Sequence, residues 1–414
     1  MPVWRGIPIL PLEPRKSTHF YFLSNISIAM SEPSVIPNPE IDDGRDPAVR
    51  EYIDNTLSAL LHGLTSHPPE PLSIALKSRA RRARHIINPN SRALEAVPRP
   101  DKYKTYFWPG KTAHEAWTFA AILQILAILD QAIRMGQLIS KRDIYYIDPG
   151  FFRAQGIVDR IVDDLAYTIG VNRTALNVEA AAKGLVMGDF RLIRGPDVLI
   201  DMQSAMEDTL IPRVEDGDEI DITRARWVLV IEKEAVFHRL ARISYHTKAL
   251  AGEGILVTGK GYPDFLTRRF LRAISDSVSN QSRTLPRFYA LTDGDPHGMA
   301  IMSTYKYGSA AHLHQNARLS IPRLQWLGLR VSDIIAVPEV LGDKALLTLT
   351  MRDRRKIVTM LHNSPVWASD GPEPQWRAEL QRMLVLNLKA EIEILYECHG
   401  GLERWINRRM FRQE

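Results

Sequence analysis

The feature that most constrains the fold of this chain is an alternation of short apolar runs with helical segments after Ala225. Trp227–Ile231, Ile255–Thr258 and Phe288–Leu291 are rich in β-branched and aromatic residues, and a segment of helical character follows each run. Short continuous apolar runs are typical of strands buried on both faces. Strands joined through helices form right-handed parallel crossovers. The sequence therefore predicts an α/β domain with a mainly parallel sheet and helices on both faces.

Carboxylates stand where two of these runs end. Glu232 follows the first run, and Asp293 and Asp295 follow the third, separated by Gly294. Ligands of parallel sheets gather at the carboxyl ends of the strands, and acids converging there would form an oxygen-only site suited to Mg²⁺. Residues two apart on an ideal strand lie about 6.6 Å apart, so both aspartates reach one ion only if the chain bends at Gly294. The alternative, acids that only form a turn and cap the helix beginning at Pro296, stays open.

A tyrosine in a basic context precedes the α/β region. Ser140 is a suitable N-cap for a helix through Arg142 and Tyr146, which share a face at four-residue spacing. Ionising a tyrosine hydroxyl at pH 7 costs roughly 4 kcal/mol, about 3 pKa units at about 1.36 kcal/mol each. A nearby cation or metal must supply much of that. Arg142 could bind a phosphate bidentately, whereas the alternative for Tyr146 is an ordinary packing role.

The region around this tyrosine predicts a winged helix-turn-helix. Long apolar periodicity over Ala113–Met135, the capped helix at Arg142–Tyr146 and a third helix within Phe151–Ile169 precede glycine-marked extended pieces over Lys183–Phe190. Three helices and a small hairpin are used to dock on duplex DNA. Lys183, Arg173 and Lys260 are candidate DNA-backbone contacts, with solvated surface charges as the alternative.

Domain boundaries follow from these patterns. We predict a disordered tail (1–48), a helical extension with a basic linker (49–110), the winged-helix domain (111–198), an acidic connection (199–221) and the α/β domain with C-terminal helices (222–414). The extension contains a helix over Pro47–Leu64 and a basic stretch from Lys77 to Arg84. This stretch is either a nuclear signal or DNA-backbone contact, or else a solvated helix face. The last helices are expected at Lys344–Leu361 and Gln375–Tyr396.

Bulk composition excludes several classes of protein. The 414 residues include 45% hydrophobic and 24% charged residues, as in an ordinary soluble protein. The net charge of +5 permits a nucleic-acid partner without requiring one. The single cysteine, Cys398, excludes an internal disulfide and a cysteine zinc cluster. The apolar run Ala116–Leu129 is shorter than the about 20 residues that a membrane span needs, so we predict no membrane role.

Five blocks occur in an order that resembles a known family. This order of motifs is similar to the A subunit of topoisomerase VI and its eukaryotic relative, the meiotic double-strand-break transesterase, from about Thr112 to the C-terminus. The blocks are Lys141–Tyr146, Lys183–Val186, Ile231–Phe237, Thr258–Asp264 and Asp293–Gly298.

The resemblance implies a winged-helix domain followed by a Toprim domain that binds Mg²⁺. By motif, Tyr146 would be the nucleophile and Arg142 its phosphate-binding neighbour, and Glu232, Asp293 and Asp295 would be the metal ligands. The family's tyrosine becomes joined to the 5′ end of DNA and leaves a free 3′ hydroxyl. Two protomers cut opposite strands of double-stranded DNA, each tyrosine working with the other protomer's metal site, so a homodimer is implied.

The implied function is a Mg²⁺-dependent DNA transesterase that starts meiotic recombination at nuclear chromosomes. The implied partners are meiotic accessory proteins and a topoisomerase VI B-like subunit. The nearest alternative is a true type IIB topoisomerase A subunit, relaxing DNA with an ATPase B subunit. Two further alternatives are a catalytically silent DNA-binding scaffold and a Toprim nuclease or primase in which Tyr146 is idle.

Overall fold

The computed structural model describes residues 47–68, 70–79, 85–97, 100–179, 182–202, 207–277, 286–310, 313, 315–335, 346–397 and 400–412. These residues belong to one unit of the chain, Asp46–Glu414. The predicted tail up to residue 46, Cys398 and three residues of the basic stretch (Arg81, Arg82 and Arg84) lie outside the described residues.

A helical core surrounds the long apolar helix. Helix α3 (Ala113–Arg134) begins at Thr112, whose hydroxyl accepts a hydrogen bond from the Glu115 amide at 3.1 Å. Helix α6 (Gln155–Ile169) packs its apolar face against the same core and ends at Gly170, which adopts the left-handed conformation expected of a helix stop. By length and composition alone α3 is able to cross a membrane, but half of its most apolar stretch is buried. The helices predicted here are confirmed.

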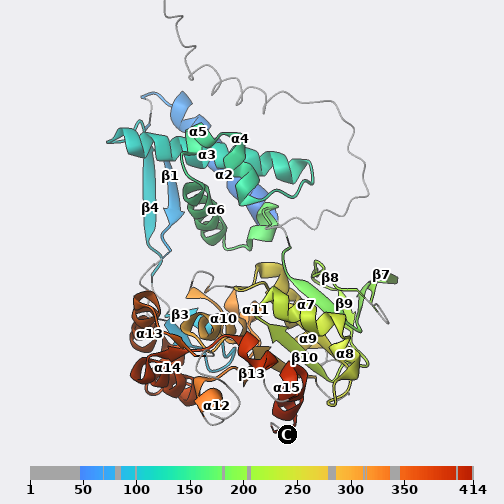
Figure 1. Ribbon diagram of the computed structural model, residues 1–414. Coiled ribbons are helices and arrows are strands. Elements are labelled where there is room, and N and C mark those ends of the chain that lie inside the picture. Colours follow the sequence, from blue (N-terminus) through green and yellow to red (C-terminus); the bar gives the residue numbers. More distant parts are fainter. Residues whose placement is uncertain are drawn as a thin grey trace, which may run out of the picture. The chain divides into compact units, whose positions relative to one another are not determined.

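The N-terminal extension is part of this helical core rather than a helix and a linker. Helix α2 (Pro47–Thr65) buries Val49 and Ile53, and the predicted helix is confirmed. Strands β1 (Leu72–Lys77) and β4 (Tyr103–Trp108) pair antiparallel beside it, as Figure 1 shows. Ile74 and Leu76 of β1 are buried and alternate with exposed neighbours. The linker predicted in this region is therefore wrong, because an alternation of only a few residues, flanked by prolines and serines, is a weak local signal for a strand.

A hairpin between these two strands contacts the other core of the chain. Strands β2 (His85–Ile87) and β3 (Leu94–Ala96) pair antiparallel. The Leu94 amide donates to the Tyr307 carbonyl at 2.7 Å, and the Asn316 side chain donates to the Leu94 carbonyl at 2.8 Å. The extension thus contributes to the helical core and, through Leu94, to one core of the α/β region.

A six-stranded sheet forms the centre of the α/β region, in the order β13-β12-β10-β11-β5-β8. Four neighbouring strands are parallel, namely β13 (Gln325–Gly328), β12 (Arg287–Leu291), β10 (Trp227–Ile231) and β11 (Gly254–Thr258). The three predicted strands are confirmed within one residue, and β13 was not predicted. The fold class is therefore α/β with a mostly parallel sheet.

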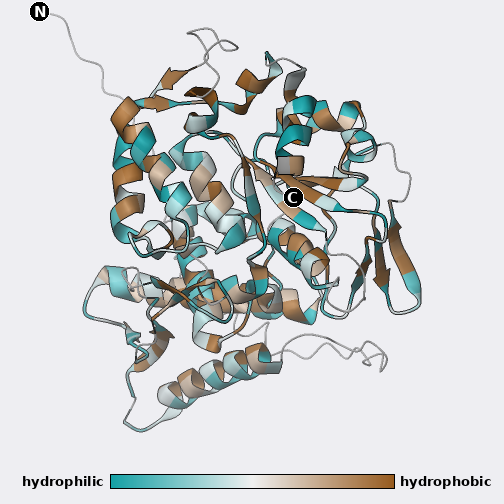
Figure 2. Cartoon of the chain, turned by 90° about the horizontal axis from the view of Figure 1, so that it is seen from below, coloured by the Kyte–Doolittle hydropathy of each residue, from teal (hydrophilic) through white to brown (hydrophobic). Residues whose placement is uncertain are grey.

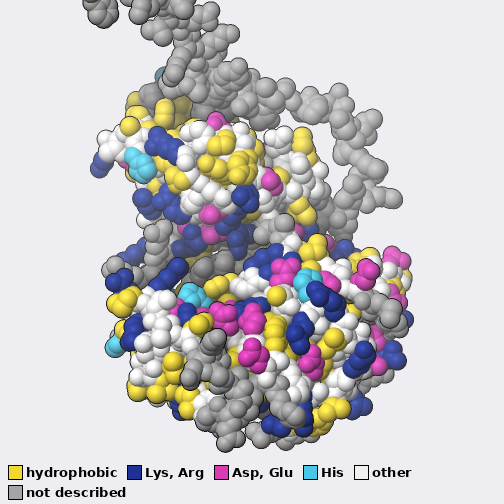
Figure 3. Space-filling view, in the orientation of Figure 1, with side chains coloured by type: hydrophobic (Ala, Val, Ile, Leu, Met, Phe, Trp, Pro, Cys, Tyr) yellow, Lys and Arg dark blue, Asp and Glu magenta, His cyan; other side chains and the backbone are white. Residues whose placement is uncertain are grey.

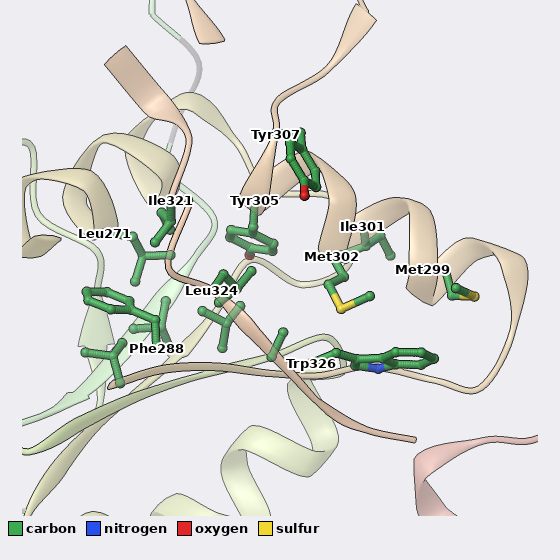
Figure 4. Close-up of a cluster of buried hydrophobic side chains, with 14 of the residues drawn as sticks. Leu271, Phe288, Met299, Ile301, Met302, Tyr305, Tyr307, Ile321, Leu324 and Trp326 are labelled. Atoms are coloured by element: carbon green, nitrogen blue, oxygen red, sulfur yellow. The ribbon is translucent and has the colours of Figure 1, made fainter. Parts of the chain in front are cut away.

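The sheet is buried on both faces, as its continuous apolar strands predicted. Val228 and Val230 belong to one core with helices α9 (Phe265–Ser277) and α10 (Pro296–Lys306), part of which Figure 4 shows around Phe288. Leu229 and Ile231 belong to a second core with α7 (Glu234–Arg242) and α15 (Gly401–Arg412). The strands accordingly appear mainly in hydrophobic colours in Figure 2.

The place predicted for the wing, over Lys183–Phe190, is wrong. Strand β5 (Leu185–Gly188) pairs antiparallel with β11 in the large sheet and not with the following strand. All four of its residues are buried, whereas a wing would leave one face in water. A three-stranded sheet, β7 (Asp197–Asp201), β6 (Arg191–Arg194) and β9 (Glu219–Asp221), includes both ends of the predicted connection (199–221).

The C-terminal helices also differ from prediction. Helix α13 (Met351–Asn363) begins at the capping residue Thr350, later than expected. Helix α14 (Pro374–Leu386) ends at Asn387, which adopts the left-handed conformation, and β15 (Leu388–Lys389) follows instead of further helix. The remaining short elements are α4 (Lys141–Ile147), α5 (Pro149–Phe152), η1 (Arg173–Leu176), β8 (Thr209–Leu210), α8 (Tyr245–Lys248), α11 (Asn316–Leu319), α12 (Val331–Ile335), β14 (Leu347–Thr348), η6 (Pro365–Trp367) and η7 (Ile392–Tyr396).

Candidate active site

Two of the predicted acids meet at the carboxyl edge of the sheet. Strands β10 and β12 are parallel neighbours with Ile231 opposite Leu291, so Glu232 and the turn after β12 leave the sheet side by side. The Glu232 Oε2 atom accepts a hydrogen bond from the Asp293 amide at 2.9 Å. The topology therefore joins groups that are 61 residues apart in the sequence.

Asp293 is held by the C-terminal part of the chain. Its Oδ1 atom accepts from the Ile392 amide at 2.9 Å, and its Oδ2 atom lies 3.3 Å from the Lys233 ammonium. Gly294 and Ala390 exchange two backbone hydrogen bonds of 2.9 and 3.1 Å. The strand and turn after α14 thus position the acidic turn. The sequence had predicted a helix up to Tyr396 in this region and therefore no such contact.

Asp295 caps the next helix. Its Oδ1 atom accepts from the amides of His297 and Gly298 at 2.8 and 2.7 Å, so the capping alternative accounts for its present conformation. A Cβ atom at Gly298 would overlap the Asp293 carbonyl and lie 2.9 Å from Glu232 Oε2. The absence of a side chain at Gly298 lets the first turn of α10 approach both other acids.

Burial makes this cluster electrostatically costly. Burial raises the pKa of Glu232, and the charge of Asp293 raises it further. Burial also raises the pKa of Asp293, although Lys233 opposes that effect. A bound divalent cation would relieve both costs. In donor chemistry the three acids fit Mg²⁺, but among the residues described no three His, Cys, Asp or Glu side chains are already grouped as ligands.

Lys233 is a functional candidate that sequence reasoning missed. Its ammonium lies 2.6 Å from Glu393 and 3.3 Å from Glu391, in addition to its contact with Asp293. Acidic side chains gather on one face of the sheet-containing part, with basic ones beside them (Figure 3). In the sequence, only the position of Lys233 directly after Glu232 indicated a role for this lysine. Its partners Glu391 and Glu393 are too distant in the sequence to be predicted as neighbours.

The tyrosine lies on the exposed face of its helix. Tyr146 is 59% exposed, and the Arg142 guanidinium lies 5.9 Å from its ring centroid, as helical spacing predicted. Its neighbour Tyr145 is partly buried and packs against the helical core. An exposed phenol beside an exposed cation is open to a large anionic substrate.

The three predicted DNA contacts all have protein partners. The Lys183 ammonium donates to the Tyr262 carbonyl at 2.7 Å, and Lys260 lies 2.8 Å from Glu234. Lys183 and Lys260 therefore meet at the turn after β11, whose Gly261 amide donates to the Glu232 carbonyl at 2.9 Å. Arg173 lies elsewhere, 3.6 Å from Asp163 on α6.

A second missed group adjoins the acidic cluster. The Lys356 ammonium donates to His297 Nδ1 at 2.8 Å and to the Tyr262 hydroxyl at 3.0 Å. Burial and Lys356 both lower the pKa of His297. A neutral imidazole can accept this hydrogen bond from the lysine, and Lys356 adds a cation beside the acids.

Two protein families match this chain, one over the α/β region and one over the helical region. The Toprim-domain family of topoisomerase 6 A subunits and Spo11 matches residues 227–402. The family described as "Type IIB DNA topoisomerase" matches residues 117–178. The first match spans the acids and the second spans Tyr146.

Individual relatives cover most of the chain. Meiotic recombination protein SPO11-1 of Oryza sativa subsp. indica is 36% identical over 67% of this chain and 69% of its own length. Meiotic recombination protein rec12 of Schizosaccharomyces pombe is 33% identical over 84% of this chain and 91% of its own length. The A subunit of DNA topoisomerase 6 of Arabidopsis thaliana is 33% identical over 66% of this chain and 60% of its own length.

Proposed function

Because the chain belongs to the Spo11/Rec12 family of meiotic recombination proteins, which is related to the A subunit of topoisomerase VI, we propose that it is a Mg²⁺-dependent DNA transesterase. It makes the double-strand breaks that initiate meiotic recombination. The observation that carries this proposal is the meeting of Glu232 and Asp293 at one sheet edge, in a chain that also exposes Tyr146 beside Arg142.

The proposed reaction is an exchange of phosphodiester bonds. The Tyr146 oxygen loses its proton and forms a bond to phosphorus, while the bond from phosphorus to the 3′ oxygen breaks. The 3′ oxygen takes up a proton, and the 5′ phosphate stays joined to the tyrosine. Arg142 binds the phosphate and stabilises the negative charge that develops on it.

Glu232, Asp293 and Asp295 would hold the Mg²⁺ ion. Asp295 Oδ1 already accepts hydrogen bonds from the amides of His297 and Gly298, so Oδ2 would be the oxygen offered to the ion. The ion, when bound, stabilises charge on the reacting phosphate and the leaving oxygen. Lys233 keeps Asp293 oriented, and its attachment to Glu391 and Glu393 supports that position.

The complete site is composite. Tyr146 of one protomer works with the acids of a second copy, so the active form is a homodimer on double-stranded DNA. Lys183, Lys260 and Arg173 are proposed to contact the DNA backbone. We also propose that the protein acts on nuclear chromosomes, together with a topoisomerase VI B-like subunit and meiotic accessory proteins.

The nucleophile is tested by Tyr146→Phe, with Tyr145→Phe as the matched control. Both changes remove one phenolic hydroxyl from the same helix. Covalent protein–DNA adducts, measured by trapping after denaturation, should disappear in the first variant and persist in the second. Normal adduct levels in Tyr146→Phe would refute the assignment, and cleaved ends free of protein would favour a Toprim nuclease.

The composite site is tested with mixed copies. One copy carrying Tyr146→Phe and another carrying Glu232→Gln leave one intact pairing of tyrosine and acids across the dimer, so single-strand nicks with attached protein are expected. A copy with both changes, paired with an unchanged copy, leaves no intact pairing and should be inactive. The opposite pattern would show that each copy uses its own acids.

A topoisomerase A subunit remains the second candidate, because relatives of that name also match. The Arabidopsis thaliana topoisomerase subunit is covered over 60% of its length, against 91% for rec12. The fuller coverage favours break formation. Relaxation of supercoiled DNA on addition of a B subunit would favour the topoisomerase.

A further inference from the structure

The helix that carries Tyr146 has little support of its own. Helix α4 has 7 residues, and isolated helices of that length are marginal in water. Its N-terminus is closed by a capping box between Ser140 and Asp143, and Ile144 is its one fully buried residue. The position of the phenol therefore depends on whatever fixes α4 to the rest of the helical core.

Lys141, the first residue of α4, provides such an attachment. Its side chain is only 15% exposed, and its ammonium is hydrogen bonded to the Asp163 carboxylate of α6 and, at 3.2 Å, to the Asp159 carbonyl. Burial lowers the pKa of Lys141, and Arg173 lowers it further. A lysine so deeply placed is not a surface charge available to DNA.

Asp163 joins Lys141 to two other segments of the chain. Arg79, just after β1, lies 3.2 Å from Asp163 and 2.6 Å from Asp164. Arg173 of η1 lies 3.6 Å from Asp163. The basic stretch that includes Arg79 was predicted to be a nuclear signal or DNA-backbone contact, or else a solvated helix face, and the structure instead pairs Arg79 with these acids. One carboxylate thus links the N-terminal extension, the tyrosine helix and the segment after α6.

We propose that Asp163 is a positioning residue for the cleavage reaction, acting through Lys141 to set where α4 presents Tyr146. This inference rests on the proposed function. Lys141 and Tyr146 are five residues apart, about 7.5 Å along a helix. A tilt of about 10° over that length moves the phenol by about 1 Å, and a misplacement of that size can cost about a hundredfold in rate.

The test uses Lys141→Met and Asp163→Asn in the full-length chain. Lys141→Met is the safer change, because Arg79 and Arg173 still compensate the charge of Asp163. Both variants should bind DNA as the unchanged protein does, while the rate of adduct formation falls about tenfold to a hundredfold. Because both variants break the contact between Lys141 and Asp163, the double variant should be no slower than the slower single variant.

The matched control is Asp130→Asn. Asp130 forms an ion pair with Arg134 within α3, so this change removes the same kind of contact without touching α4. It should leave adduct formation unchanged. Lys141→Arg keeps a cation at the position and should recover part of the lost rate.

Three outcomes separate the possibilities. Unchanged adduct formation in Lys141→Met would overturn the positioning role. Equal losses of DNA binding and adduct formation would also overturn it, since they would indicate a substrate contact. If Tyr146→Phe still forms adducts, the proposed function fails first, whatever the Lys141 variants do.

Discussion

Replacing Gly298 with alanine should damage the acidic cluster even though alanine favours helices. In an ordinary helix the change from glycine stabilises the protein by up to about 1 kcal/mol. At Gly298 the new Cβ would overlap the Asp293 carbonyl and lie 2.9 Å from both the Asp293 amide and Glu232 Oε2. Overpacking of this kind costs about 1–3 kcal/mol. The net expectation is a loss of about 0–3 kcal/mol of unfolding free energy, from the difference of those two effects.

Gly156→Ala is the matched control for this prediction. Gly156 lies in the first turn of α6, and no atom lies within 4 Å of a Cβ built there. This variant should be stabilised by up to about 1 kcal/mol. Thermal unfolding resolves the contrast, because 1 kcal/mol shifts the midpoint by about 2–4 °C in a domain of 150–250 residues.

Adduct formation provides the second measurement on the same two proteins. To accept a Cβ at position 298, helix α10 must move away from Glu232 and Asp293. A displacement approaching 1 Å is expected to slow cleavage by about a hundredfold, whereas Gly156→Ala should cleave normally. The reasoning is refuted if Gly298→Ala is as stable as Gly156→Ala and cleaves DNA at the unchanged rate.

Two further predictions concern charge. A carboxyl group whose pKa is higher in the folded than in the unfolded protein stabilises the fold at low pH, and this contribution is lost as the pH rises through the folded value. Without metal, Glu232 and Asp293 should therefore make unfolding easier above about pH 4, and Mg²⁺ should raise the unfolding midpoint more at higher pH. An identical pH dependence in a Glu232→Gln, Asp293→Asn double variant would contradict this. For DNA binding, Lys183→Ala should lower the slope of log affinity against log salt by about 0.9 if Lys183 contacts one phosphate; an unchanged slope would show that it serves only the Tyr262 turn.

Local patterns in the sequence were enough to predict much of this protein. The strand Trp227–Ile231, the helix at Pro47 and the stop at Gly170 follow from periodicity, residue shape and glycine, all of which act over a few neighbouring residues. The contact between Arg142 and Tyr146 could be predicted from their four-residue spacing on one helix alone. The order of the motifs also pointed to the family to which the chain belongs.

Tertiary structure decided which distant segments meet. Strand β5 joins the large sheet because its residues are buried on both faces, which no local wing-like pattern revealed. The turn after α14 binds Asp293, and Asp163 collects cations from positions 79, 141 and 173. Such contacts form when long-range packing closes the chain on itself, and they leave no periodic signal in the sequence. The sequence was therefore sufficient to predict which residues form the candidate site. Only the tertiary structure showed which distant residues hold them in place.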